Sequence, residues 1–596
     1  MPKPIVTDTY DFPTLIRRGY VYVDKTALLH RLISGVDGLM FFLSRPRRFG
    51  KSLMISTLDQ IFRGNRELFK GLAIAKMDYD WTRYPVIRLD MSSVRANVID
   101  EYRRLLCEVV AAEAVRHRLT LDEKVQPGWM LGQLIEKLAR RGRKVVVLVD
   151  EYDAPLSGLL GDPKMLAAVQ GLLHDFYVTL KVRVADIHFL MMTGVSKFSK
   201  LSVFSGLNNL TDLSMNGHYA ELLGYTPSEL RRFFAPHLKA FAKANGIGER
   251  RAVAELLDWY DSYRFSPESA ACVCNPVSIG CALSRGKIGS YWSRTGNATL
   301  IIERLRKAKK LPIDLEGFEA SVDSLEFCDA KSLPFATLMY QGGYLTIKSV
   351  RPDGRLILGI PNREVALSLG SGFLTALTED PTDDFVSAVQ DLRKHLEDGV
   401  MTDEGLARLL TAVFAMVPHE WKLGNESEAK RYFLLFMKMA GADIAAEVES
   451  SKGRADAVVK TEKAIYVLEF KYGKSARAAL QQVVAQGYAK PYVDDGRAIV
   501  GVGVNYNPNA HEVAIAREVV KRFGEVVNST GEVVNSIDEV VNETIRANPG
   551  CRKPKLLLLI RTSRATLERS LARLASAGRV EFRGASKTGG YYIHEG

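Results

Sequence analysis

The stretch Leu39–Ser52, LMFFLSRPRRFGKS, constrains the fold of this 596-residue chain more than any other. Its first five residues are apolar, as in a buried central strand, and the residues after it repeat apolar side chains at helical spacing. The triplet Gly50-Lys51-Ser52 lies between them. A strand, a loop, GK[ST] and a helix are the parts of a phosphate-binding loop, in which the Lys reaches the terminal phosphates and the Ser hydroxyl ligates Mg²⁺. Arg45 replaces the first Gly of the full pattern, so an ordinary strand, turn and helix is the alternative.

A second stretch, Lys144–Asp153, also favours nucleotide binding. It reads KVVVLVDEYD, a run of apolar residues followed by Asp150 and Glu151. In P-loop enzymes such a strand brings an Asp to the Mg²⁺ shell, and an adjacent Glu can orient the attacking water. The alternative is a buried strand that ends in a solvated acidic turn. Because two half-motifs follow their expected strands, the sequence predicts ATP and Mg²⁺ as cofactors.

Residues 39–220 alternate short apolar runs with helical patterns, which predicts a parallel sheet covered by helices on both faces. The runs after the first are Val86–Met91, Val145–Val149 and Ile187–Met192. Thr193 ends the last run, where it is either a sensor of the γ-phosphate or a strand-terminal cap. We therefore expect Glu151 to act in catalysis and the following residues to bind nucleotide: Arg48, Gly50, Lys51, Ser52, Asp150 and Thr193.

Composition narrows the class of protein and its partners. The net charge of +12 favours an anionic partner, nucleic acid being the usual one. The six cysteines lack metal-ligand spacing and indicate free thiols in a reducing compartment. No apolar run approaches the ~20 residues of a membrane span, and the N-terminus lacks a signal-peptide core. We expect a cytoplasmic, soluble protein that makes no contact with a membrane.

A second chemical site is predicted around Asp456 and the triplet Glu469-Phe470-Lys471, which begins after twelve intervening residues. In a strand, Glu469 and Lys471 share one face while Phe470 faces the core. A preceding strand, Ala455–Val459, would place Asp456 beside them. Two carboxylates can then hold Mg²⁺ as metal ligands, and the Lys can orient or deprotonate water for attack on a phosphodiester.

Two further residues are candidates for the same catalytic site. Glu428, on the preceding helix, is the candidate extra acid, and Gln482, on the following helix, is the candidate phosphate or water contact.

Several stretches in sequence order resemble the prokaryotic AAA-ATPase-like family whose members carry a C-terminal PD-(D/E)XK nuclease domain. They are YDF (10–12), YVDKT (22–26), RPRRFGKS (45–52), VDEYD (149–153), TGVSKFSKLSVFSGLNNLTDLSM (193–215), WYDSYRF (259–265), CNPVSI (274–279) and YQGGYLTI (340–347). In that family the missing first Gly and the Arg-rich loop are usual. The resemblance covers roughly residues 5 to 510 and also includes the surroundings of Asp456 and Glu469. Glu447 also resembles an acidic position of that nuclease domain, where it either binds metal or caps a strand.

Residues 517–544 contain four seven-residue units with Val-Val in register. A heptad period predicts a helix that can pair with a second copy of the chain, giving a homo-oligomer. Gly524, Gly531 and many β-branched residues disfavour a helix, so a duplicated linker is the alternative.

The tail, residues 546–596, resembles a winged helix: two helical patterns followed by a hairpin around GASKTGG. It holds eleven Lys and Arg against three Glu, a net charge of +8. The candidate DNA-binding residues are Arg564, Arg569, Arg573 and Lys587. A protein-docking module is the alternative.

The sequence thus predicts an α/β multidomain chain. Its parts are a P-loop parallel-sheet ATPase domain (1–222), a helical lid or connector (223–415), a PD-(D/E)XK α/β nuclease-like domain (416–510), a heptad-repeat linker (511–545) and a small winged-helix domain (546–596). The predicted function is ATP binding and hydrolysis coupled to Mg²⁺-dependent cleavage of DNA. The alternative is an ATP-sensing DNA-binding regulator or scaffold whose nuclease fold is catalytically idle.

Overall fold

A computed structural model describes most of the chain and divides it near Phe373 into two compact units. The described residues are 2–122, 124–159, 161–197, 209–292, 316–326, 334–377, 391, 407, 410–411, 424–439, 442–450, 453–461, 463–493, 495–510, 512–521, 526–527, 533–534, 537–560, 564–585 and 589–594. Within these ranges every helix is too short or too polar to span a bilayer.

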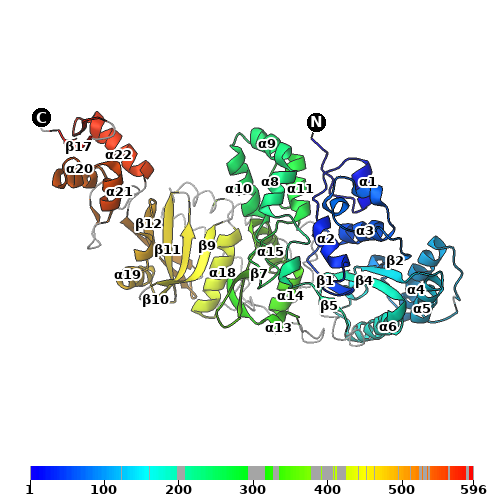
Figure 1. Cartoon of the computed structure of the whole chain (residues 1–596). Coiled ribbons are helices and arrows are strands. Elements are labelled where there is room, and N and C mark those ends of the chain that lie inside the picture. Colours follow the sequence, from blue (N-terminus) through cyan, green and yellow to red (C-terminus); the bar gives the residue numbers. More distant parts are fainter. Residues whose placement is uncertain are drawn as a thin grey trace. The chain divides into compact units, whose positions relative to one another are not determined.

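The first unit is built around a five-stranded sheet in the order β2-β3-β4-β1-β5 (Figure 1). Its strands are β1 (Met40–Ser44), β2 (Val86–Asp90), β3 (Val145–Asp150), β4 (Ile187–Gly194) and β5 (Thr211–Asp212). All neighbouring strands are parallel, which confirms the predicted parallel sheet. Since β4 lies between β1 and β3, the phosphate-loop strand and the Asp150 strand are two positions apart.

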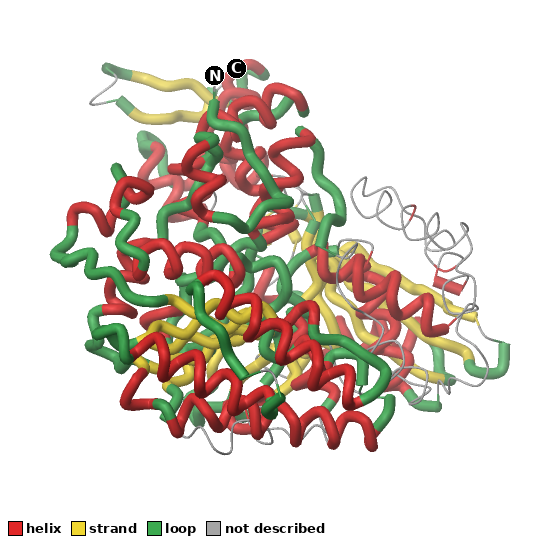
Figure 2. Tube along the Cα trace, turned by 90° about the vertical axis from the view of Figure 1, so that its right-hand side faces the viewer, coloured by secondary structure: helices red, strands yellow, loops and turns green. Residues whose placement is uncertain are grey.

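Helices cover both faces of this sheet because its apolar strands present side chains to both sides. Helix α3 (Lys51–Phe62) packs on one face, where the rings of Phe62 and Phe189 lie 4.9 Å apart. The other face is buried under α4 (Ile99–Arg116), α5 (Pro127–Ala139) and α6 (Pro163–Val182). Figure 2 shows helices lying against the strands.

The rest of the first unit contains helices and a small sheet. The helices are α1 (Phe12–Arg17), α2 (Thr26–Ile33), α8 (Pro227–Phe233), α9 (Ala235–Ala244), α10 (Glu249–Tyr260), α11 (Pro276–Arg285), α13 (Val322–Glu326), α14 (Phe335–Gly342) and α15 (Arg363–Leu377). The antiparallel sheet β6-β8-β7 comprises Glu316–Ala320, Leu356–Gly359 and Thr346–Val350. The connector over 223–415, predicted as helical, therefore also contains strands, because alternating apolar side chains such as Leu356 and Leu358 are buried.

The second unit contains a mixed sheet in the order β13-β12-β11-β10-β9. The elements are α18 (Glu426–Met439), β9 (Asp443–Ser450), β10 (Gly453–Lys460), β11 (Ala464–Tyr472), α19 (Ala476–Gln486), β12 (Ala498–Asn507) and β13 (Glu512–Lys521). Only β11 and β12 pair in parallel. Helix α19 crosses β12 so closely that a Cβ on Gly503 would lie 2.0 Å from the Ala476 carbonyl oxygen, which requires glycine at position 503.

Residues 517–544 differ from a continuous heptad helix. Their first part belongs to β13, and the short strands β14 (Val526–Val527) and β15 (Val533–Val534) pair in antiparallel fashion. Paired β-branched residues favour strands over helix. Among the residues of this segment that the structure describes, helix begins at Ile537. No homo-oligomer through a heptad helix is supported by the described part of this segment.

The C-terminal elements share one apolar core. They are α20 (Ile537–Ala547), α21 (Lys553–Ile560), α22 (Arg564–Ser576), β16 (Val580–Arg583) and β17 (Gly590–Ile593), and Cys551 adds a single bridge to Tyr591. Val541 and Ile545 of α20 pack with the apolar residues of α22. The tail therefore begins at α20, inside the range predicted as linker, because α20 buries its apolar side there.

Candidate active sites

The loop between β1 and α3 has the backbone of a phosphate cradle. Arg48 (φ 67°) and Gly50 (φ 94°) adopt left-handed conformations, which occur in the anion-binding nests of backbone N–H groups. Lys51 begins α3, and its buried ammonium donates hydrogen bonds to the carbonyl oxygens of Arg45 (2.9 Å) and Pro46 (3.0 Å). The Lys51 side chain therefore folds back from the end of the loop to contact the beginning of the same loop.

Acidic and hydroxyl groups gather beside this loop at the carboxyl edge of the sheet. Asp150 is buried and accepts a hydrogen bond of 2.7 Å from the Thr193 hydroxyl. Burial, and then the charge of Asp150, raises the pKa of Glu151, whose backbone is left-handed (φ 51°). Burial lowers the pKa of Lys51, and the nearby carboxylates, Asp150 first, oppose that shift. The structure therefore brings Lys51, Asp150, Glu151 and Thr193 together, while the hydroxyl bond fits both interpretations of Thr193.

Arg45 explains how the loop forms without its first glycine. The guanidinium is buried and donates hydrogen bonds to the carbonyl oxygens of Ser44 (3.0 Å) and Ser214 (2.6 Å). It lies 4.2 Å from the centre of the Phe265 ring. Burial lowers the Arg45 pKa to about 10. The Arg45 side chain thus holds the end of β1 against Ser214 and Phe265, which lie far along the chain.

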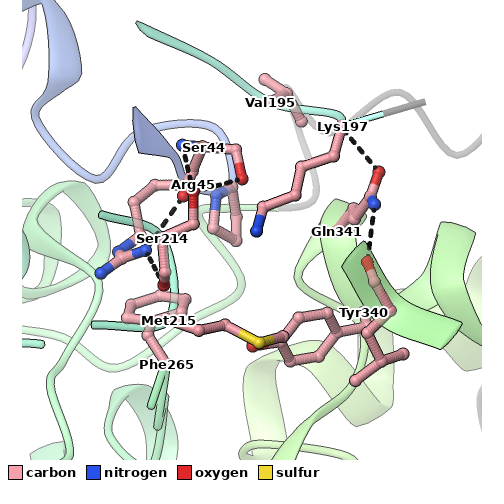
Figure 3. A pocket seen from close by; sticks show the side chains of 11 residues that line it. Ser44, Arg45, Val195, Lys197, Ser214, Met215, Phe265, Tyr340 and Gln341 are labelled. Atoms are coloured by element: carbon pink, nitrogen blue, oxygen red, sulfur yellow. Dashed lines mark hydrogen bonds between the residues drawn. The ribbon is translucent and has the colours of Figure 1, made fainter. Parts of the chain in front are cut away.

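A small cavity of about 20 Å³ adjoins Arg45 (Figure 3). Lys197 reaches into it and pairs with Asp212, the two charged groups being 3.1 Å apart. The Gln341 side chain of α14 accepts the backbone N–H of Lys197 at 2.9 Å. A water molecule needs roughly 10–15 Å³ of such space, so the cavity is far too small for a nucleotide. It is a packing junction between the sheet and α14.

In the second unit, Asp456, Glu469 and Lys471 meet beside the sheet as predicted from their strand positions. The Lys471 ammonium lies 3.0 Å from Glu469 Oε1 and donates to the Phe470 carbonyl at 2.9 Å. The backbone N–H of Phe470 donates to Asp456 Oδ2 at 2.7 Å. Burial first, and the charge of Asp456 second, raises the pKa of Glu469 to about 6.

These residues fit a hard divalent cation. Glu469 Oε2 is buried and has no hydrogen-bond partner, so one carboxylate oxygen is unsatisfied beside Asp456. Carboxylate oxygens are the ligands that Mg²⁺ prefers in proteins. In the part of the chain that the structure describes, no group of three or more His, Cys, Asp or Glu side chains is placed to hold an ion. Asp456 and Glu469 are therefore the candidate ligands at this site.

Two residues of α18 that sequence reasoning missed lie at this site. Glu426 Oε1 is 3.4 Å from the Lys471 ammonium, and the Lys430 ammonium is 2.8 Å from Asp456 Oδ1. Glu428 has a different position. Its carboxylate accepts a hydrogen bond from the Gly424 backbone N–H at 2.8 Å, and its backbone N–H donates to the Asn425 side-chain oxygen at 2.9 Å. The sequence Asn425–Glu428 has the spacing of a capping box, a signal that assigns Glu428 to the helix start.

Two other candidates have no defined contact at this site. Gln482 is half-buried on α19, which packs on β11 and β12. The Glu447 side chain lies outside the described residues. The roles assigned to both remain predictions.

In the tail, the predicted DNA-binding arginines differ in their surroundings. Arg573 forms two hydrogen bonds with Asp538 of α20, of 2.9 and 2.7 Å, and Arg564 lies 3.3 Å from Glu568. Arg569 is exposed on the same helix, α22. Lys587 lies outside the described residues. Arg573 therefore has a structural partner within the tail.

Comparison with known proteins identifies both domains. Residues 6–204 match the family described as predicted AAA-ATPase, and residues 424–515 match the PD-(D/E)XK nuclease superfamily. Fold and family models thus define a chain that joins a P-loop, ATPase-like domain to a nuclease-superfamily domain. An uncharacterized protein in the vnfD 5′ region of Azotobacter chroococcum mcd 1 is 33% identical over 514 residues, covering 84% of this chain and 95% of the relative. The chain belongs to the prokaryotic AAA-ATPase-like family with a C-terminal PD-(D/E)XK nuclease domain.

Solved structures give only a weak likeness. Cdc6p from Pyrobaculum aerophilum is 11% identical, with a TM-score of 0.21, and the ORC2 protein of Aeropyrum pernix is 13% identical, with a TM-score of 0.24. Each match covers 59% of this chain and 92% of the other chain. At these scores the likeness carries no argument.

Proposed function

We propose that this protein binds and hydrolyses ATP and that its second unit cleaves DNA phosphodiesters with Mg²⁺. The observation that carries the proposal is the meeting of Asp456, Glu469 and Lys471 beside one sheet, with a buried Glu469 oxygen that lacks a partner. The net charge of +12 favours an anionic substrate of this kind.

At the nuclease site, Asp456 and Glu469 would hold the cation. When bound, the cation would supply Lewis-acid stabilisation of phosphoryl oxygens and an activated water. Lys471 lies against Glu469, and its ammonium would orient water or contact the scissile phosphate. Glu426, which faces Lys471, would keep that side chain in place.

At the ATPase site, Lys51 would contact the terminal phosphates, and Ser52 and Asp150 would share the Mg²⁺. Glu151 would orient the attacking water, and Thr193 would link Asp150 to the γ-phosphate through its hydroxyl. Support comes from the cluster of these groups at one edge of the sheet and from the hydrogen bond between Thr193 and Asp150.

The tail would bind DNA as a winged helix. Its order of helix, bridge, two helices and hairpin supports this role, and residues 537–596 hold eleven Lys and Arg against six Asp and Glu, a net charge of +5. Arg564 and Arg569, exposed on α22, are the proposed contacts. Because phosphate contacts release counterions, this binding would weaken steeply with salt.

One observation favours the second candidate, an ATP-sensing DNA-binding scaffold with an idle nuclease fold. Both oxygens of Asp456 already have donors, from Lys430 and from the Phe470 backbone. In that reading, Lys430 permanently replaces a metal.

Cleavage assays separate the two candidates. Purified protein is incubated with linear, circular and branched DNA, with and without Mg²⁺ and ATP, and Asp456→Asn is the matched variant. Metal-dependent cleavage by the parent and none by the variant supports the nuclease. ATP hydrolysis and DNA binding without cleavage under any metal would leave the scaffold.

A further inference from the structure

The Lys430 ammonium contacts Asp456, one of the two carboxylates proposed to hold the metal ion. Its ammonium lies 2.8 Å from Oδ1, and the backbone N–H of Phe470 lies 2.7 Å from Oδ2. A strand N–H cannot leave without breaking local structure, whereas a lysine side chain can swing away. Oδ1 is therefore the oxygen that can be released to a cation.

The placement of Lys430 follows from the helix that carries it. Glu426 and Lys430 are four residues apart on α18 and so share one face. That face meets the strand residues in two ion pairs, Glu426 with Lys471 and Lys430 with Asp456. The Lys430 and Asp456 side chains are 15% and 20% exposed, so solvent ions can reach them.

The charges at this site decide what must happen when a cation binds. Three acidic residues (Glu426, Asp456, Glu469) and two lysines (Lys430, Lys471) give the site a formal net charge of −1. A divalent cation held by Asp456 would change this to +1. The Lys430 ammonium is 2.8 Å from that carboxylate, and like charges that share one carboxylate repel each other where solvent is partly excluded. Lys430 would then leave Asp456, and an anion that accepts its ammonium would favour cation binding.

We propose that Lys430 is a positioning residue that makes divalent-cation binding and phosphodiester binding depend on each other. Its ammonium blocks Asp456 Oδ1 until a nucleic-acid phosphate draws it away. The inference rests on the proposed nuclease function and deepens it by adding a regulated metal site. Because coupling is reciprocal, DNA raises the cation affinity by the same factor by which the cation raises the DNA affinity.

The test is calorimetric titration of Ca²⁺, which takes the same class of oxygen ligands, into the full chain at pH 8. Titrations are run with and without a short DNA duplex. We expect DNA to tighten Ca²⁺ binding by roughly tenfold, equivalent to 1.4 kcal/mol. Lys430→Met should bind Ca²⁺ roughly tenfold tighter than the parent without DNA, and DNA should then add little.

Three controls keep the result specific. Lys430→Arg retains a cation and should retain the coupling. Lys463→Met removes the same charge from an exposed position before β11 and should behave as the parent. Thermal melting shows whether Lys430→Met is folded, and Lys430→Gln replaces it if it is not.

Equal Ca²⁺ affinities for the parent and Lys430→Met, with and without DNA, would overturn the role of Lys430. If Asp456→Ala then abolishes Ca²⁺ binding, the metal site itself survives and only the inference fails. If the folded parent and Lys430→Met both bind no Ca²⁺, the inference and the metal site of the proposed function fail together.

Discussion

Replacing Arg45 by methionine should destabilise the first unit by about 3 kcal/mol while leaving ATP affinity within about fivefold of the parent. The change removes donors from the buried carbonyls of Ser44 and Ser214, at 3.0 and 2.6 Å, and the cation from the Phe265 ring, at 4.2 Å. Hydrogen bonds to a charged group contribute about 1.5–3 kcal/mol each, and a desolvated cation–π contact about 2 kcal/mol. The cost of burying the guanidinium, visible in its lowered pKa, offsets part of that sum.

Urea unfolding followed by tryptophan fluorescence measures this loss. Four of the five tryptophans (Trp81, Trp129, Trp259, Trp292) belong to the first unit, so the signal reports mainly on it. With a slope near 3 kcal/mol per molar urea, the midpoint should fall by about 1 M. Arg18→Met, an exposed arginine after α1, is the matched control and should leave the midpoint unchanged.

The opposite pattern would refute the assignment of Arg45 as a structural residue. An unchanged urea midpoint together with a large loss of ATP affinity would mean that the guanidinium faces the nucleotide.

Three further predictions concern the other sites. Glu151→Gln should bind ATP normally but hydrolyse it about 100-fold more slowly, because only the water-orienting carboxylate is lost. Steady-state ATP turnover at the parent rate would mean that Asp150 and Glu151 only end the strand and take no part in hydrolysis. The Glu469 pKa is raised to about 6 in the fold, so its stabilising contribution is complete below pH 4.5 and disappears as pH rises through 6. Glu469→Gln should accordingly stabilise the metal-free second unit above pH 6 by about 1–2 kcal/mol, and thermal melting from pH 4.5 to 8 should show no such gain if the carboxyl is unperturbed. Deleting residues 537–596 should weaken DNA binding and lower its salt slope in fluorescence anisotropy, whereas an identical slope would favour a protein-docking tail.

The strands that carry chemistry were predictable because their signals are local. The run Val145–Val149 is apolar throughout and is buried on both faces, and Asp150 follows directly. Glu469 and Lys471 share a strand face by simple alternation, as predicted. The direction of the Arg45 side chain was not predictable, because its acceptor at Ser214 lies 169 residues away in sequence.

Glu426 and Lys430 were missed at the nuclease site because which residues of α18 face the strands depends on where the helix begins. Asn425 and Glu428 cap the start of α18. With the helix beginning there, Glu426 and Lys430 are the pair that contacts strand residues. The prediction of a continuous helix from the Val-Val repeat failed for a related reason. Val526–Val527 and Val533–Val534 pair across a short ladder, which a heptad count cannot distinguish from a helical seam.

The most direct test of the nuclease assignment is to measure metal binding and DNA cleavage together in Lys471→Met. Lys471 contacts Glu469 and Glu426 but is itself a cation, so it cannot be a metal ligand. We predict that the folded variant loses cleavage of plasmid DNA by about 100-fold or more while retaining Mg²⁺ or Ca²⁺ affinity and the parent rate of ATP hydrolysis. Cleavage by Lys471→Met at the parent rate would contradict the assignment of Asp456, Glu469 and Lys471 as the nuclease centre.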